Sequence, residues 1–98
     1  MKREVNLQQG FLFRAVCGVH EVFTDQHRAE GGIDQAMTPA ELFIASLGTC
    51  IGVYAVRFCT RHNLPTAGLK ASLDWTVVKD PWRIGGIKAE IHYPHDIP

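Results

Sequence analysis

One uncharged stretch constrains this chain more than any other feature. The 15 residues from Leu42 to Val56 contain no Asp, Glu, Lys or Arg. Directly before them, Thr38 and Glu41 have the spacing of a capping box, in which each side chain accepts a hydrogen bond from the other residue's backbone amide. Pro39 suits the first helical position because a helix leaves that amide unpaired. The pattern predicts a long helix that begins at Thr38.

The end of this helix is also marked in the sequence. Arg57, Arg61 and His62 place positive charge near the carbonyl end of the helix, where the dipole favours it. Asn63 can adopt the left-handed conformation of a C-cap, and Pro65 cannot continue the helix. The predicted helix therefore has about 24 residues and is roughly 36 Å long. It is apolar around most of its circumference, so we expect it to be buried on several sides.

A membrane span is the first alternative to a core helix. A span needs about 20 apolar residues, whereas this run is shorter and contains Ser46, Gly48, Thr49 and Gly52. Residues 1–9 are polar and lack the pattern of a signal peptide. We therefore expect no membrane association and a helix in the core of a protein.

Composition narrows the class of protein. A chain of 98 residues predicts a single domain over 1–98, small enough that oligomerisation is expected. The 10 basic and 10 acidic residues form no basic block, so no nucleic-acid partner is expected. Three cysteines do not make a disulfide framework and fit a reducing cytoplasm. Cys59 with His62, and His92 with His95, could together supply four zinc ligands. The second pair falls at a strand end with a proline, and no C-x-x-C is present, so no metal is expected.

The remaining segments alternate between apolar and polar residues, as strands do. Segments 2–8, 11–17 and 19–24 predict a meander of short antiparallel strands, followed by a loop over 25–37. Segments 69–77 and 87–93 predict a hairpin that packs its apolar face on the helix. Its connection contains a turn at 79–81, with residues 82–86 in a loop. The fold class is therefore α+β, with antiparallel sheets wrapped on one long central helix.

Gly48 and Gly52 are four residues apart on the predicted helix. Glycine costs about 1 kcal/mol relative to alanine in a helix, so a packing gain is expected in return. Small residues at this spacing let another element approach the backbone. That element is either a strand of the same subunit or the helix of a second subunit.

The segment E-G-G-I-D-Q-A-M-T-P-A-E-L-F-I-A-S-L-G-T-C, residues 30–50, resembles the OsmC/Ohr family of osmotically inducible and organic-hydroperoxide-resistance proteins. The order of the predicted elements is similar too. The resemblance implies a cytoplasmic stress-response protein with the family's fold, in which two chains form an intertwined homodimer with the helices packed inside. It also implies a peroxidase that reduces organic hydroperoxides and needs no metal or organic cofactor.

The resemblance also implies a set of site residues. Cys50 corresponds to the reactive cysteine, whose thiolate attacks the hydroperoxide and becomes a sulfenic acid. Arg28 is the match for the activating cation, and Glu41 for the acid that holds it. Phe43 and Leu47 are apolar residues that could accommodate an alkyl tail. A cation is needed because a helix dipole acts mainly within its end turns, and Cys50 is in the middle.

Each of these residues also has an alternative role. Cys50 could be a small buried apolar residue, Arg28 a solvated loop charge, and Glu41 only a cap. Arg14 is the rival to Arg28 as the activating cation.

The family's resolving cysteine lies on a second long helix, and this chain ends before such a helix. Cys59 is about 13–14 Å from Cys50 along the helix, too far for a disulfide within one subunit. An external thiol is therefore the expected reductant. The alternative function is a non-catalytic dimeric module of the same fold, either a small-ligand binder or an inactive truncated relative.

Overall fold

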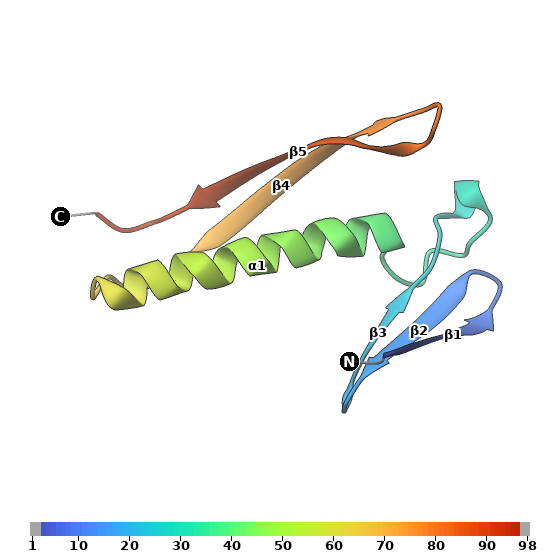
Figure 1. Ribbon diagram of the computed structural model, residues 1–98, viewed down its shortest axis with the longest axis horizontal. Coiled ribbons are helices and arrows are strands. Elements are labelled where there is room, and N and C mark those ends of the chain that lie inside the picture. The colour runs from blue at the N-terminus through green and yellow to red at the C-terminus, as the bar shows by residue number, and fades with distance from the viewer. Residues whose placement is uncertain (1–2, 97–98) are drawn as a thin grey trace. The chain divides into compact units, whose positions relative to one another are not determined.

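The computed structural model describes residues 3–96 and shows two antiparallel sheets and one long helix (Figure 1). The predicted strand start at Lys2 lies outside the described range. In chain order the elements are β1 (Glu4–Gln9), β2 (Leu12–Cys17), β3 (His20–Thr24), the 3₁₀ helix η1 (Arg28–Glu30), α1 (Pro39–Arg61), β4 (Lys70–Val78) and β5 (Arg83–His92).

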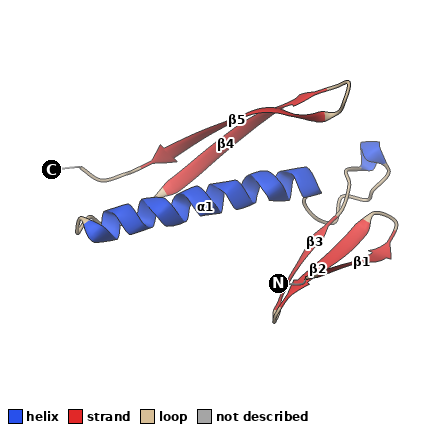
Figure 2. Ribbon diagram, in the orientation of Figure 1, coloured by secondary structure: helices blue, strands red, loops and turns tan. Residues whose placement is uncertain are grey.

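The predicted α+β class is confirmed. One sheet has the order β1-β2-β3 and the other is the β4-β5 hairpin (Figure 2). The chain divides into two units, residues 1–43 and residues 44–98. Each unit is described below by itself, and the assignment of 1–98 to one domain stays a prediction.

The first unit contains the predicted meander and the loop that follows it. β2 pairs with β1 on one side and with β3 on the other, with Val5 opposite Ala15 and Ala15 opposite Val22. Gly10 forms the first turn with a φ of +54°, a left-handed conformation that glycine adopts without a steric cost. All six residues of β1 are exposed in this chain. The alternation therefore identifies the strand, but within residues 3–96 its apolar side chains stay largely exposed.

The predicted caps of the long helix are confirmed at both ends. The Thr38 amide donates to Glu41 Oε1 at 2.9 Å, and the Glu41 amide donates to Thr38 Oγ1 at 3.1 Å. At the other end, Asn63 has a φ of +57°, and the Leu64 amide donates to the Cys59 carbonyl at 2.8 Å. These bonds satisfy terminal groups that an α-helix cannot pair internally.

In the second unit, the β4-β5 hairpin packs on α1. Ala71, Leu73 and Trp75 are half-buried while their neighbours in β4 are exposed, as the alternation predicts. An alanine Cβ built at Gly48 would lie 2.5 Å from Leu73 Cδ1. The element that approaches Gly48 is thus a strand of the same chain, one of the two predicted alternatives. Among the described residues, none lies within 4 Å of such a Cβ at Gly52, so close packing there stays a prediction.

The connection of the hairpin differs from the prediction. Arg83 and the two glycines after Ile84 belong to β5 rather than to a loop. Thr76 pairs with Gly86 and Val77 with Ile84, so Gly85 is the extra residue of a β-bulge. A Cβ at Gly85 would collide with the Val78 side chain, which explains the glycine. The alternation of β4 shifts at the same point, since Val77 is exposed and Val78 half-buried.

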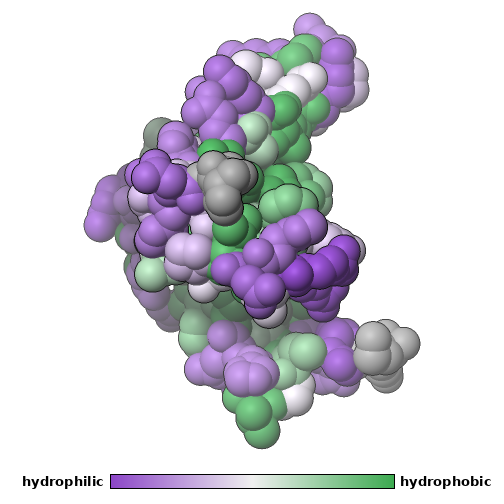
Figure 3. Space-filling view, turned by 90° about the vertical axis from the view of Figure 1, so that its left-hand side faces the viewer, coloured by the Kyte–Doolittle hydropathy of each residue, from purple (hydrophilic) through white to green (hydrophobic). Residues whose placement is uncertain are grey.

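Few apolar side chains are buried within this chain. Among the described residues, only Ile44 and Cys59 are buried hydrophobic residues. Figure 3 shows apolar residues reaching the surface beside polar ones. By length and composition α1 could cross a membrane, and 17% of its apolar window is buried. The core helix of a soluble protein meets the same criterion, so this is weak evidence for a span.

The contact between Gly48 and Leu73 gives a test of how the hairpin packs. We expect Gly48→Ala to destabilise the protein by about 1 kcal/mol, because overpacking of about 1–3 kcal/mol exceeds the gain in helix propensity. Leu73→Ala removes the atoms that collide with the new methyl group. Urea unfolding gives the free energy of unfolding of both single variants and of the double variant. The double variant should lose less free energy of unfolding than the two single variants lose together. Strict additivity would mean that Leu73 does not face Gly48.

Candidate functional site

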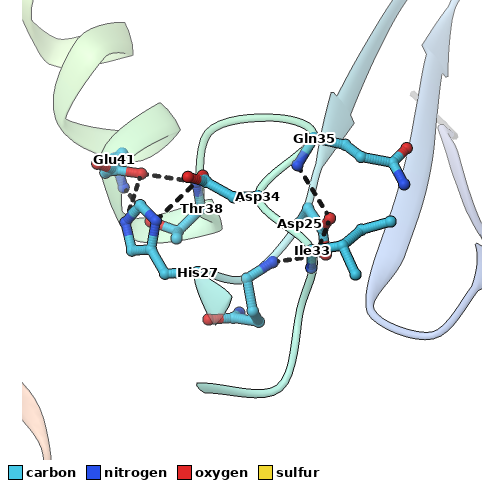
Figure 4. A network of polar contacts seen from close by, with 8 residues as sticks. Asp25, His27, Ile33, Asp34, Gln35, Thr38 and Glu41 are labelled. Atoms are coloured by element: carbon cyan, nitrogen blue, oxygen red, sulfur yellow. Dashed lines mark hydrogen bonds and ion pairs between the residues drawn. The ribbon is translucent and has the colours of Figure 1, made fainter. Parts of the chain in front are cut away.

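The loop over residues 25–37 is held together by one buried carboxylate. Asp25 is 1% exposed, and its side chain accepts hydrogen bonds from the amides of Gln26 at 2.7 Å, Ile33 at 3.4 Å and Gln35 at 3.2 Å (Figure 4). Its own amide donates to the Met37 carbonyl at 3.1 Å. The two ends of the loop are thereby joined, and the loop has a defined conformation.

The charge of Asp25 is maintained despite its burial. Burial by itself would raise the pKa of this carboxyl group, since it disfavours the charged form. The three amide donors and the more distant charge of Arg28 outweigh that effect, so the pKa lies below its usual value. Asp25 is therefore an ionised structural centre of the loop.

The loop leaves no room for a side chain at Gly32. A Cβ at Gly32 would collide with the Gln26 carbonyl and come within 2.8 Å of Asp25 Oδ1. The loop and the β1-β2 turn enclose a cavity of about 270 Å³, whose lining includes Phe11, Asp25 and Ile33. The Gly31-Gly32 pair of the sequence thus allows the chain to close tightly around the carboxylate.

His27 connects this loop to the first turn of α1. Its Nδ1 lies 3.2 Å from Asp34 Oδ1, and its Nε2 lies 3.4 Å from Glu41 Oε1. The contact with Asp34 and the charge of Glu41 raise the pKa of His27, and Glu30 acts in the same direction. The pKa of Glu41 is lowered, mainly by the hydrogen bond from the Thr38 amide. Burial acts in the opposite direction, and the Thr38 side chain and His27 lower the pKa further.

The predicted site residues occupy both units. In the first unit, Arg28 is an exposed residue at the start of η1. Glu41 is half-buried and lies in the first turn of α1. Within residues 3–96, Glu41 is ion-paired with His27 and no ion pair joins it to Arg28. The rival cation, Arg14, is paired with Glu21 at 2.6 Å. The roles of Arg28 and Glu41 in the reaction stay predictions.

Cys50 lies near the middle of α1, in the second unit, and is exposed in this chain. Leu47 is half-buried and precedes it by three residues, so the two side chains share one face of the helix. Phe43 lies one turn further back and is exposed. An accessible thiol therefore shares one face of the helix with the apolar side chain of Leu47.

The other cysteines have different surroundings. Cys59 is buried in the second unit and borders an apolar cavity of about 200 Å³ with Phe58, Leu69 and Tyr93. Cys17 is exposed in the first unit, and Arg3 Nε donates to its sulfur at 2.9 Å. Within residues 3–96, no group of three or more His, Cys, Asp or Glu side chains is arranged to hold a metal ion.

The sequence analysis did not assign His27, Asp25 or Asp34 a role. Asp25 could have been recognised from its place directly after a strand and before a glycine pair, where a short acidic side chain can collect loop amides. No comparable signal identifies the contacts of His27. Its partners Asp34 and Glu41 lie seven and fourteen residues further along the chain, so the contacts depend on how the loop folds back.

Comparison with known proteins places this architecture in a family. A crystal structure of a Psychrobacter arcticus 273-4 protein, provisionally described as an osmotic stress induced and detoxification response protein, superposes with a TM-score of 0.90. It is 20% identical, and the match covers 100% of this chain and 73% of that one, which shows a shared fold. No curated protein matches this sequence. Residues 31–97 match the model of the OsmC-like proteins, and the chain therefore belongs to the OsmC-like family.

Proposed function

We propose that this protein is a cysteine-dependent peroxidase that reduces organic hydroperoxides in a cytoplasmic stress response. The observation that carries the proposal is the exposed thiol of Cys50, near the middle of the helix of an OsmC-like fold. Family membership supports a protein of the stress and peroxide-detoxification type. It also agrees with a soluble protein in which α1 is a core helix rather than a membrane span.

The proposed reaction begins at the sulfur of Cys50. The thiolate attacks one peroxide oxygen, so an S–O bond forms as the O–O bond breaks. Sulfur is oxidised by two electrons to a sulfenic acid, and the hydroperoxide is reduced to an alkoxide that takes up a proton to become an alcohol. Leu47 and Phe43 would contact the alkyl group. No metal or organic cofactor is needed for this step.

The return of Cys50 to the thiol requires two further electrons. Cys59 lies nine residues further along the same helix, roughly 13–14 Å away, and a disulfide needs Cα atoms within about 7 Å. We therefore propose an external thiol reductant. A first thiol attacks the sulfenic sulfur and releases water, which leaves a mixed disulfide, and a second thiol releases Cys50 together with an oxidised disulfide product.

Arg28 is the proposed activating cation. A thiol in the middle of a helix gains little from the helix dipole, so a positive side chain must stabilise the thiolate. Within residues 3–96, Arg28 is in no ion pair, whereas Arg14 is already paired with Glu21. Arg28 also begins η1 in a loop that Asp25 holds in one conformation. These features favour Arg28 over Arg14.

We further propose that the active form is a homodimer. Val53, Tyr54, Val56 and Phe58 of α1 are all exposed in this chain, and Tyr54 is 65% exposed. Large exposed apolar patches on a protein often mark a protein–protein interface. A second copy of the chain would cover this part of the helix, as the resemblance to the family implies.

The reactive thiol can be tested by trapping its first oxidation product. After one equivalent of cumene hydroperoxide and then dimedone, intact mass should show one adduct in the wild type and none in Cys50→Ser. Cys17→Ser and Cys59→Ser should retain the adduct. Cys17 needs this control because it is exposed and contacts Arg3. No adduct in a folded wild-type protein would contradict the proposal and favour a non-catalytic module.

The activating cation can be tested with two matched arginine variants. We expect Arg28→Gln to slow the oxidation of Cys50 by about 100- to 1,000-fold, the range seen when one donor is removed from an oxyanion hole. Arg14→Gln should leave the rate unchanged. Stopped-flow measurement of the reaction with hydroperoxide gives both rates, and the reverse ranking would assign the role to Arg14.

The oligomeric state can be tested by sedimentation velocity. The wild type should sediment with twice the 10.9 kDa mass of the chain. Val53→Asp should dissociate or unfold it, because an ionised group would be buried without a partner. Thr66→Asp places the same charge at an exposed polar position after α1 and should remain dimeric. A wild type that is monomeric at micromolar concentration would contradict the proposal.

A further inference from the structure

The two ring nitrogens of His27 both face carboxylate oxygens. Nδ1 faces Asp34 in the loop and Nε2 faces Glu41 in the first turn of α1 (Figure 4). An ionised carboxylate only accepts hydrogen bonds, and a neutral imidazole has a single N–H donor. Both contacts can therefore be hydrogen bonds only while His27 is protonated. Loss of one proton leaves a ring nitrogen with only a lone pair facing a carboxylate, which weakens that contact.

We propose that His27 is a pH-dependent latch, whose imidazolium ties the loop over residues 25–37 to the first turn of α1 by bridging Asp34 and Glu41. Three carboxylates raise the pKa of His27: Asp34 from the loop, Glu41 from α1 and Glu30 from η1. His27 is half-exposed, so protons exchange with water directly. The latch responds to pH without any larger opening of the fold.

The surrounding backbone explains why His27 can control the loop. The His27 carbonyl accepts hydrogen bonds from the amides of Glu30 at 2.9 Å and Gly32 at 3.2 Å. The Asp34 amide donates to the Gln26 carbonyl at 3.1 Å. The side chain and the backbone of His27 therefore both hold the segment over residues 27–34, which includes Arg28.

The direction of the pH effect follows from the charges. The pKa of folded His27 is raised, so its contribution to stability is complete below the ordinary histidine value of 6.5 and is lost as pH rises through the raised pKa. The pKa of Glu41 is lowered from 4.5, so its contribution is complete above that value and is lost as pH falls through the lowered pKa. The latch is therefore closed at pH values above the lowered pKa of Glu41 and below the raised pKa of His27.

The first test is an NMR titration of the His27 ring in the full-length protein. Glu41→Gln keeps an oxygen that can accept from the Thr38 amide, and Asp34→Asn suits the left-handed φ of +59° at that position. Each variant should therefore fold. Each should lower the pKa of His27, and the double variant should lower it further. Glu21→Gln removes a negative charge that is paired with Arg14 instead and should have no effect.

The second test asks whether protonation closes the loop. Hydrogen exchange at the amides of Gly32 and Asp34, corrected for the intrinsic effect of pH, should accelerate in the wild type as His27 loses its proton. In His27→Gln the corrected rates should not change with pH. A His27 pKa that neither acidic-residue variant moves, or equal pH dependence in the wild type and His27→Gln, would overturn the proposal.

A link to catalysis rests on the proposed function. The latch engages Glu41, the proposed partner of Arg28, so His27→Gln should alter the pH profile of Cys50 oxidation beyond the titration of the thiol itself. If Cys50 is not oxidised at all, the peroxidase proposal fails, while the NMR and exchange measurements still decide whether His27 is a latch.

Discussion

The buried carboxylate of Asp25 is the interaction on which the candidate site depends. Backbone amides that turn inward in a loop need an acceptor, because an unpaired buried amide costs free energy comparable to a lost hydrogen bond. Asp25 satisfies three such amides at once, and its own amide closes the loop at Met37. The closure ends at Met37, directly before the capping box of Thr38 and Glu41 that begins α1.

Glu41 combines two functions that are usually considered separately. As a cap it accepts from the Thr38 amide, and as an anion it faces His27 through the same oxygen, Oε1. A cap alone would explain the residue, as the sequence already suggested. The contact with His27 adds a dependence on protonation, so the start of the helix is coupled to the charge state of the loop.

The sequence predicted the fold more completely than the site, and particular residues show why. Thr38, Glu41 and Asn63 mark the helix through local hydrogen bonds, which depend only on residues a few positions apart. Gly85 was assigned to a loop because a glycine pair resembles a turn, whereas here one glycine forms a bulge next to Val78. The bridge made by His27 depends on the three-dimensional path of the loop, which no local pattern encodes. The surroundings of Cys50 in the proposed dimer also depend on three-dimensional packing and stay a prediction.

The exposed apolar side chains of α1 and the chemistry proposed for Cys50 are connected. A thiolate reacts with a hydroperoxide most readily where its charge is stabilised and bulk water is limited, yet Cys50 is exposed in the single chain. The residues around it that lack cover, such as Val53 and Tyr54, are the ones that a second copy would bury. Under the proposed function, dimerisation would supply both the missing core and the enclosed surroundings of the thiol. The short chain would then need its partner for catalysis as well as for stability.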